Sequence, residues 1–501
     1  MTESAHLYAA VITGFEKVAS REISEKLPAT ECFSGRGNVR FCLDLNSVPD
    51  ILKLRSVDNL YVVFYENEIV GLTDMEKEKA LKTIKQQLSY CNWELAIDVY
   101  QLAQGKNIYG GSDLVVDQMR EFMREGKRCE VTENSPKFRV TCKRCGEKEI
   151  HTFSSMDAAS KFGAEINNAF GWKCSVKEFD IEVVLRIEKD NMTVMMALND
   201  ESLFKRNICA YGPTTMRSTV CYCMLHLASI KPGDVVMDSM CGGGSIPIEG
   251  ALAWNTAFFL GGDNHESAME RCKKNWSSNS SSTKSNCEFF NWDATNLPLR
   301  ENCIDALVTD LPFGKKIGSK TDNRLLYPIL LNEWKRVLRK GGRLVVMGHD
   351  KRTLEKAILA DRSSWHIKAN HIVNMGGLQC LCLCLINTKR FCRILQDRVG
   401  LFLDLPTSSI SRRGNLPEQL PGLTGLESRW QDQQNGMKGA VWFPGCTNFH
   451  RSEDSYNGRI GRIPIQMRAA TKWNGSFQRS MSGSAWSSGS IDFQNSESTF
   501  Q

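Results

Sequence analysis

Four consecutive residues at the end of an apolar run have the types that an active-site edge requires. They are Asp310, Leu311, Pro312 and Phe313, and they follow the strand-like stretch "CIDALVT". A carboxylate can accept hydrogen bonds or a proton, a proline fixes a turn, and an aromatic ring offers a face for stacking. The simpler interpretation is a strand that ends in a turn, and the residues upstream distinguish the two.

Aspartate also ends three earlier strand-like runs, at Asp238, Asp263 and Asp293. In an open parallel sheet the ligand crevice lies outside the carboxyl ends of the strands, so these side chains would share one edge with Asp310. Asp263 could accept hydrogen bonds from two ribose hydroxyls, and Asp293 from an adenine amine. A single aspartate after a strand is most often a turn-former or a helix cap. Four in series indicate a nucleoside ligand whose reactive end faces Asp310.

A glycine-rich turn, Gly242–Gly244, follows the first of these aspartates. Glycines there let the backbone approach a ligand closely, and a helix is expected to begin near Ser245. The spacing differs from the dinucleotide pattern G-x-G-x-x-G, because Pro247 stands where the third glycine would be. The turn alone is weak evidence for a ligand, and its position beside the aspartates strengthens it.

Alternating strand-like and helical runs would position these residues. The alternation predicts a mainly parallel, doubly wound α/β sheet. The last two strands are separated only by the short link "NMGG", so the final strand is expected to be antiparallel. The predicted strands are "DVVMD", "FFLGGD", "CEFFNWD", "CIDALVTD", "RLVVMG", "HIKANHIV" and "LQCLCLCLI".

The chain has 501 residues, which is too long for one ordinary core. A strand and helix alternation near the start predicts a small α/β unit, and a later basic strand, helix and hairpin predict a second one. The final segment is rich in Ser, Gly, Asn and Arg, which predicts disorder. The expected division is a small unit over 1–70, a connecting region over 71–130, a second α+β unit over 131–205, the doubly wound domain over 206–390 and a disordered tail over 391–501.

The composition describes a soluble globular protein, with 42% hydrophobic residues and a net charge of +6. That charge permits an anionic partner such as RNA without demonstrating one. We expect no signal peptide and no membrane segment, because the longest apolar run is too short to span a bilayer. The 19 cysteines are scattered through apolar segments, which indicates reduced thiols in the cytoplasm or nucleus.

One pair of cysteines, Cys142 and Cys145, has metal-ligand spacing, with Cys129 and His151 nearby. A closed zinc site normally needs a second well-spaced pair, and none follows. Two ordinary thiols on or near a strand are therefore the preferred interpretation, and no metal is expected.

Several segments resemble the successive motifs of class I methyltransferases that use S-adenosylmethionine, and most closely the guanine-N2 branch with an amino-terminal THUMP module. The resemblance covers roughly residues 6–390. It implies a Rossmann-like methyltransferase domain with a seven-stranded, mostly parallel sheet, preceded by an α+β THUMP module with a small ferredoxin-like N-terminal unit. The motifs are "DSMCGGGSIPIEGA", "GGDN", "WDATNLPL" and "VTDLPFGKKIGSK", with "KFRVTCKRCGEK", "FGWK" and "ESLFKRNICAYGPTTMRST" in the THUMP region and the link.

The resemblance also implies which residues bind the cofactor. Gly242 and Gly244 would lie along its methionine part, with Asp238 and Cys241 beside them. Asp263 would hold the ribose and Asp293 the adenine amine.

The catalytic residues implied are the four that fill the D-x-P-F/Y tetrad of amino methyltransferases. Asp310 and the Leu311 carbonyl would accept the two hydrogens of the guanine amine, Pro312 would fix the turn, and Phe313 would stack on the target base. That base must leave its helix to enter the site.

An RNA-binding role is predicted for seven basic residues. The predicted substrate is tRNA, and the family resemblance further implies a small zinc-binding activator subunit that would cover an apolar edge of the catalytic sheet. Exposed lysines on a loop are otherwise usually just solvated. The seven residues are Arg139, Lys143 and Arg144 on the basic strand, Arg206 and Arg217 in the link, and Lys315 and Lys316 after the tetrad.

Two departures from the family's first motif leave alternatives open. Ser239 replaces an expected proline and Gly243 an expected threonine, which predicts weaker cofactor binding. One alternative is methylation of adenine N6 or of a protein amide nitrogen, which the same tetrad serves, or of a guanosine in another structured RNA. The other is a non-catalytic RNA-binding protein with a decayed cofactor site.

Overall fold

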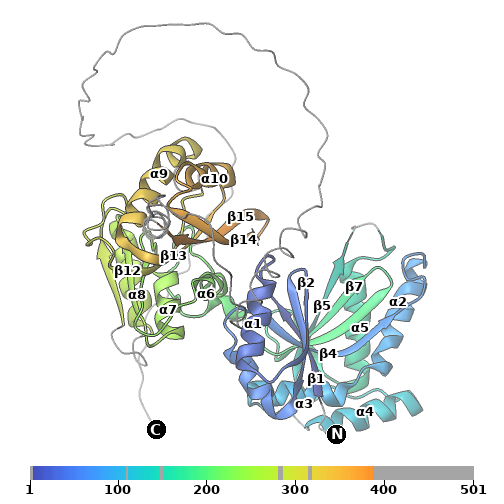
Figure 1. The fold of residues 1–501 in the computed structure, drawn as a ribbon. Helices are drawn as coiled ribbons and strands as arrows, with labels where there is room; N and C mark the ends of the chain where they lie inside the picture. Colours follow the sequence, from blue (N-terminus) through green and yellow to red (C-terminus); the bar gives the residue numbers. More distant parts are fainter. Residues whose placement is uncertain (1–3, 109–110, 147–149, 280–285, 314–318, 389–501) are drawn as a thin grey trace, which may run out of the picture. The chain divides into compact units, whose positions relative to one another are not determined.

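The computed structural model describes residues 4–108, 111–146, 150–279, 286–313 and 319–388. The strands of this part form two sheets, which we call the N-terminal sheet and the catalytic sheet (Figure 1). The predicted tail over 391–501 lies outside the described residues. Among the described residues, no helix is long and apolar enough to cross a membrane.

The N-terminal sheet combines strands from both units that the sequence predicted before residue 206. Its order is β2-β3-β1-β4-β8-β7-β5-β6, and β4 pairs with β8 through the register Tyr61↔Ala197. The two predicted units therefore share one sheet. The strands are β1 (Ser4–Ala10), β2 (Thr30–Gly35), β3 (Asn38–Asp44), β4 (Asn59–Glu68), β5 (Lys137–Cys145), β6 (Lys173–Cys174), β7 (Ile181–Glu188) and β8 (Asn191–Ala197).

Helices pack on one face of this sheet and form a single apolar core with it. The predicted connecting region is part of that core, because Trp93, Ile97 and Tyr100 are buried in it. The helix over 155–170 is capped by Ser154, whose side chain accepts a hydrogen bond from the Asp157 backbone N–H. The helices are α1 (Glu16–Lys26), η1 (Leu45–Lys53), α2 (Lys77–Gln86), η2 (Gln87–Tyr90), α3 (Trp93–Gln104), α4 (Gly111–Glu125) and α5 (Ser155–Phe170), with η3 (Leu203–Lys205) in the link.

The catalytic sheet confirms the predicted α/β fold. Its order is β11-β10-β9-β12-β13-β15-β14; β9 to β13 run parallel, and β15 is antiparallel to both of its neighbours. All seven predicted strands are present among the described residues. They are β9 (Val235–Asp238), β10 (Phe258–Asp263), β11 (Cys287–Asn291), β12 (Ile304–Asp310), β13 (Leu338–Gly348), β14 (Trp365–Met375) and β15 (Leu378–Asn387).

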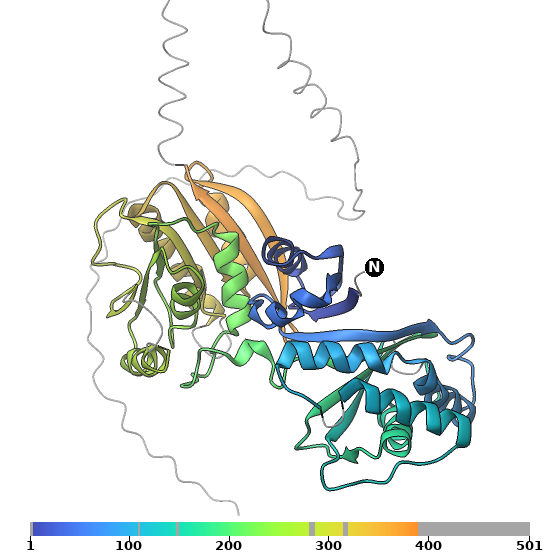
Figure 2. The same cartoon turned by 90° about the horizontal axis from the view of Figure 1, so that it is seen from below.

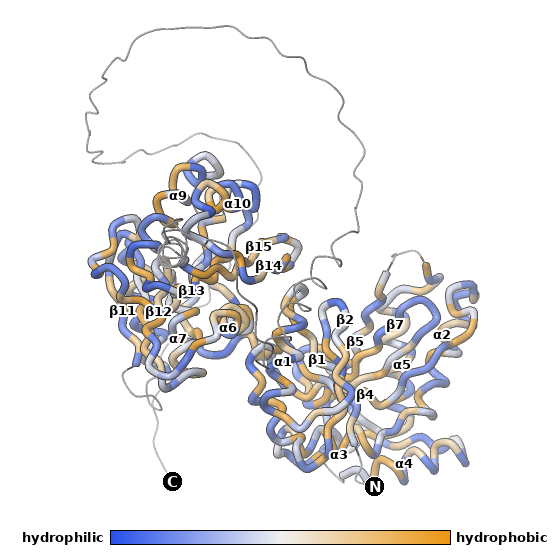
Figure 3. The backbone as a smooth tube through the Cα atoms, in the orientation of Figure 1, coloured by the Kyte–Doolittle hydropathy of each residue, from blue (hydrophilic) through white to orange (hydrophobic). Residues whose placement is uncertain are grey.

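Apolar clusters cover both faces of the catalytic sheet, as the near-continuous apolar strands predict. Figure 2 shows α6 in green alongside the orange strands β14 and β15, and Figure 3 shows α6 and β12 as hydrophobic segments. One of the clusters also includes Ile12, Phe15 and Val18 of the N-terminal half. The helices are α6 (Ser218–Leu227), α7 (Ser245–Ala253), α8 (Glu266–Ser277), α9 (Lys320–Val337) and α10 (Lys351–Ala360).

Candidate active site

The strand order brings three of the predicted aspartates to one edge. β9 lies between β10 and β12, with Gly261 opposite Asp238 in the register. The hydroxyl of Thr309 donates to Asp238 Oδ1 at 2.7 Å. This hydrogen bond joins β12 to β9 at their carboxyl ends. Asp263 and Asp310 end the strands on either side, so the carboxyl edge carries a group of acids, as the sequence predicted.

The glycine-rich turn connects β9 to α7 and lies against Asp263. The backbone N–H of Gly242 donates to Asp263 Oδ2 at 3.0 Å. Gly242 and Gly244 have φ values of 55° and 83°, and a Cβ added at Gly244 would lie 3.0 Å from the ring of Phe289. Both backbone positions favour glycine, because side chains rarely adopt the left-handed region. The conformation of the turn therefore depends on its glycines and on the hydrogen bond to Asp263 at the end of β10.

Burial and mutual repulsion raise the pKa of two of these carboxyl groups. Burial, with a smaller contribution from the nearby Asp263, raises the pKa of Asp310 to about 7. Asp238 is buried, and that burial together with Asp310 holds its pKa well above the usual range. A group of acids that resist ionising together is suited to a ligand that carries positive charge.

The tetrad is held by buried groups of α9. The Pro312 carbonyl accepts hydrogen bonds from Asn323 Nδ2 at 3.1 Å and from the Tyr327 hydroxyl at 2.8 Å. The backbone N–H of Leu311 donates to the Met347 carbonyl at 2.8 Å, which continues the pairing of β12 with β13. These bonds fix the turn that presents Asp310 and the Leu311 carbonyl. The two α9 residues could not be found from the sequence, because their spacing from Pro312 matches no local motif.

The ring of Phe313 lies beside His349, with ring centroids 6.2 Å apart and planes inclined by 46°. Phe313 is half-buried, so part of its surface is exposed at the edge. The lysines after the tetrad, Lys315 and Lys316, lie outside the described residues.

Asp293 has a different position from the other three aspartates. It stands two residues after β11, is exposed, and its Oδ1 accepts hydrogen bonds from the backbone N–H and hydroxyl of Thr295 at 2.8 and 2.7 Å. These are the contacts of a turn-former. Its predicted contact with an adenine amine stays a prediction.

The two departures from the family motif fit their surroundings. The buried hydroxyl of Ser239 accepts a hydrogen bond from Trp334 Nε1 at 3.0 Å, and its carbonyl accepts one from Trp292 Nε1 at 3.2 Å. Gly243 has no positive φ, and a Cβ there would meet Asn275 Nδ2 at 3.4 Å, which is ordinary contact. Neither residue therefore disrupts the turn.

The predicted RNA-binding residues of β5 do not gather in one place. Arg139 and Lys143 point to the face without helices, where Arg139 pairs with Glu182 at 3.0 Å and Lys143 lies 5.6 Å from the ring centre of Tyr61. Arg144 points to the opposite face, because side chains alternate along a strand, and its Nε is 3.4 Å from the hydroxyl of Ser155. The three residues therefore do not share one face of the strand, and their RNA-binding role stays a prediction.

The two predicted RNA-binding residues of the link already have protein partners. Arg206 Nη2 lies 2.8 Å from Glu249 Oε1, in α7. Arg217 pairs with Asp58 at 3.0 Å, and its guanidinium is 4.4 Å from the ring centre of Phe204. Arg206 is mostly buried and its guanidinium is engaged within the protein, so an RNA-binding role for Arg206 and Arg217 stays a prediction.

The two cysteines with metal-ligand spacing, Cys142 and Cys145, do not point to a common site. Cys142 and Cys145 alternate onto opposite faces of β5. In the described residues, a different group combines ligand types: His6, Glu31 and Cys42, beside a cavity of about 490 Å³ in the N-terminal sheet. Burial and Glu31 raise the pKa of the Cys42 thiol to about 11. The thiol is therefore protonated and donates a hydrogen bond to Glu31. Hydrogen bonding without a metal ion explains why these side chains lie together.

The raised pKa of Asp310 predicts how any reaction at this edge depends on pH. An acceptor carboxylate must be ionised, so kcat/KM should rise about tenfold per pH unit below about 7 and level off above it. A cationic ligand at saturation favours the ionised form, so the rise in kcat should lie at lower pH. Initial rates from pH 5.5 to 9 test this. A flat profile below pH 7 would contradict the role of Asp310 as acceptor.

Two family models match the chain, one before residue 206 and one from residue 206 onwards. The methyltransferase domain described as UPF0020, RMKL-like, matches residues 206–380, and the THUMP domain matches residues 115–197. The "tRNA (guanine(6)-N(2))-methyltransferase THUMP3" of Mus musculus is 35% identical over 450 residues, which cover 75% of this chain and 88% of that protein. The chain belongs to the family of THUMP-domain guanine-N2-methyltransferases. The Bos taurus protein of the same name is 34% identical over 448 residues, with the same coverage of both chains.

More distant members of the family and solved structures are similar over comparable lengths. The "tRNA (guanine(6)-N2)-methyltransferase" of Methanocaldococcus jannaschii is 22% identical and covers 74% of this chain and 97% of that protein. The crystal structure of TrmN from Thermus thermophilus has a TM-score of 0.59 at 20% identity, covering 76% of this chain and 99% of that one. A putative methyltransferase, SMU.472, in complex with SAH has a TM-score of 0.56 at 15% identity, covering 78% and 100%. The structural likenesses establish the fold.

Proposed function

We propose that the chain transfers a methyl group from S-adenosylmethionine to the exocyclic N2 amine of guanosine 6 in tRNA, forming N2-methylguanosine. The main support is the edge where Asp310 and its rigid turn lie beside Asp238, Asp263 and the glycine turn. The relatives at 34–35% identity are named for guanine 6 of tRNA, whereas those named for U6 snRNA are 24–25% identical. The higher identity favours tRNA as the substrate.

The residues of the edge fit this cofactor. S-adenosylmethionine supplies a methyl group that is activated by a sulfonium centre. Asp263, which holds the Gly242 N–H, would accept hydrogen bonds from the ribose hydroxyls. The glycine turn lets the chain approach the methionine part closely, and Asp238 and Cys241 lie beside it. The positive charge would offset the burial and the repulsion that raise the pKa values of Asp238 and Asp310.

The edge residues would position and polarise the amine. The lone pair of the guanine N2 amine is delocalised into the ring, so the nitrogen is a poor nucleophile. Asp310 and the Leu311 carbonyl accept its two hydrogens and draw the nitrogen towards tetrahedral geometry. Asp310 then takes the released proton, directly or through water, for which a pKa near 7 is suited. The target base leaves its helix and stacks on the exposed part of Phe313.

A partner subunit is proposed for one edge of the catalytic sheet. Among the described strands, β11 is the outermost beside β10, and the side chain of Phe290 on it is 45% exposed. An unpaired edge with an exposed aromatic ring is a site where another chain can add a strand. The small zinc-binding activator implied by the family would bind there. We also propose a reducing compartment, cytoplasm or nucleus, since the described cysteines are all free thiols.

Cofactor binding and methyl transfer test the proposal together. Calorimetry should show binding of S-adenosylmethionine, and unmodified tRNA should incorporate label from methyl-labelled cofactor. Both measurements are made with and without the activator subunit, because a missing partner can reduce activity. A chain that does not bind the cofactor under either condition would support the decayed, non-catalytic alternative instead.

A further inference from the structure

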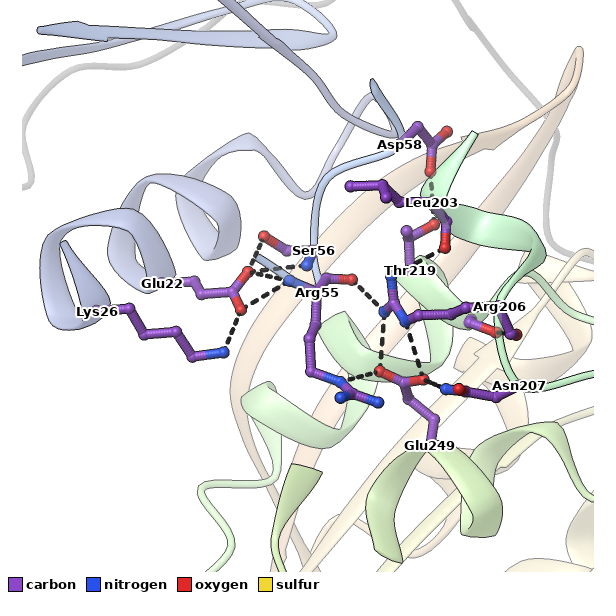
Figure 4. A network of polar contacts seen from close by, with 11 residues as sticks. Glu22, Lys26, Arg55, Ser56, Asp58, Leu203, Arg206, Asn207, Thr219 and Glu249 are labelled. Carbon is purple, nitrogen blue, oxygen red and sulfur yellow. Dashed lines mark hydrogen bonds and ion pairs between the residues drawn. The ribbon is translucent and has the colours of Figure 1, made fainter. Parts of the chain in front are cut away.

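A fully buried carboxylate follows the cofactor turn. Glu249 lies in α7, shortly after Gly244, and its side chain is 0% exposed. Burying a charge is costly unless each oxygen has hydrogen-bond partners. Here Oε1 accepts from Arg55 Nε at 2.7 Å, and Oε2 accepts from Asn207 Nδ2 at 2.7 Å (Figure 4). Arg206 donates to both oxygens, to Oε1 at 2.8 Å and to Oε2 at 3.3 Å.

The partners of Glu249 come from different parts of the chain. Arg55 follows η1 in the N-terminal half, whereas Arg206 and Asn207 belong to the link that precedes α6. Arg206 Nη2 also donates to the Arg55 carbonyl at 2.5 Å, so the link and the N-terminal half contact each other at the same point. One side chain of the catalytic domain therefore holds both segments (Figure 4).

Arg55 is itself held in place by α1. The buried carboxylate of Glu22 accepts hydrogen bonds from the backbone N–H groups of Arg55 at 2.9 Å and Ser56 at 2.8 Å, and from Lys26 Nζ at 2.6 Å. Burial alone would raise the pKa of Glu22, but Lys26 and these hydrogen bonds outweigh it and lower the pKa. The loop that carries Arg55 is thus fixed on the N-terminal side before it reaches Glu249 (Figure 4).

A second contact ties the link to the cofactor turn directly. Asn275, buried in α8, donates to the Gly243 carbonyl at 2.8 Å and accepts from the Ala210 backbone N–H at 2.7 Å. It also accepts from the Cys209 N–H at 3.0 Å. The helices on both sides of the glycine turn, α7 and α8, therefore hold the same short stretch of the link.

We propose that Glu249 is a positioning residue, which sets the N-terminal half and the link relative to the cofactor turn so that RNA bound by one half reaches the methyl donor in the other. The inference rests on the proposed function. The Ile12, Phe15 and Val18 cluster supplies apolar contact between the halves, so the polar network is not needed to keep them attached. Its directional bonds instead fix their angle, and small misplacements of reacting groups reduce rates strongly.

Arg55→Gln tests the inference, because Arg55 contacts Glu249 from the N-terminal side and leaves Arg206 and Asn207 in place. We expect kcat for tRNA methylation to fall about 10- to 100-fold, with the Kd for S-adenosylmethionine and the KM for tRNA within about threefold of wild type. Arg55→Lys should recover part of kcat, because it restores the charge. Asn207→Gly removes a single side-chain hydrogen bond and suits the left-handed backbone at this position, where φ is 68°. It should lower kcat less and serves if Arg55→Gln does not fold.

The control variant is Lys335→Gln, which removes an ion pair of 2.6 Å with Asp361 inside the catalytic domain. It should leave kcat unchanged. A wild-type kcat in both Arg55→Gln and Asn207→Gly would overturn the inference. A loss of cofactor affinity equal to the loss in kcat would also overturn it, because it indicates a merely structural role. A wild-type chain that does not methylate tRNA would overturn the proposed function and the inference with it.

Discussion

Asp310→Ala should lose methylation by about 10²- to 10⁴-fold while the fold and the binding of tRNA remain. The variant removes the group that accepts an amine hydrogen and takes the proton. It leaves the Pro312 carbonyl with its partners on α9, so the turn keeps its position. It also removes one of the acids that repel each other at the edge, so stability should not fall. Single-turnover rates with labelled cofactor measure the loss.

The matched variant is Asp310→Asn, which keeps an oxygen that accepts a hydrogen bond but cannot take a proton. Its activity should lie between that of wild type and Asp310→Ala, and it should lose the rise in rate towards pH 7. Near-normal turnover of Asp310→Ala would contradict the assignment of the tetrad as the reaction edge.

Gly244→Ala should weaken cofactor binding at least about tenfold. A non-glycine residue in the left-handed region costs about 1–2 kcal/mol, and a factor of ten in Kd corresponds to about 1.4 kcal/mol. The φ of Gly244 is 83°, and the added Cβ would press against the Phe289 ring at 3.0 Å. The turn would have to shift away from the conformation that admits the ligand. Calorimetric titration with S-adenosylmethionine measures the change.

The neighbouring residue provides the control for this variant. Gly243 has an ordinary φ and room for a Cβ, so Gly243→Ala should bind the cofactor within about twofold of wild type. Gly243→Thr, which restores the residue expected in the family, should also be tolerated. Equal affinities for Gly244→Ala and wild type would show that the turn does not contact the cofactor.

The catalytic sheet could be predicted because its information is local. Each strand is a short apolar run that ends at a recognisable residue, and parallel strands bring their carboxyl ends together. Asp238, Asp263 and Asp310 therefore met as expected. Asp293 did not follow the rule as closely, because β11 ends at Asn291 and the Asp293 carboxylate accepts a hydrogen bond from Thr295 in the turn that follows.

Long-range contacts limited the prediction elsewhere. The pairing of β4 with β8 unites two units that read as separate, since no local pattern records which strands become neighbours. Similarly, the hydroxyl of Tyr327 and the indole of Trp334 support the site from α9, far along the chain from the residues that they contact. The ion pair of Arg206 with Glu249 could not be predicted either, because Glu249 lies in another element of the chain.

Mapping the methylated nucleoside is the most direct test of the proposed reaction. Unmodified tRNA that carries guanosine 6 is incubated with the chain, the activator subunit and S-adenosylmethionine, then digested and analysed by mass spectrometry. The account predicts N2-methylguanosine at position 6, and none in a tRNA in which adenosine replaces that guanosine. N6-methyladenosine as the product, or N2-methylguanosine that persists after the replacement, would contradict it.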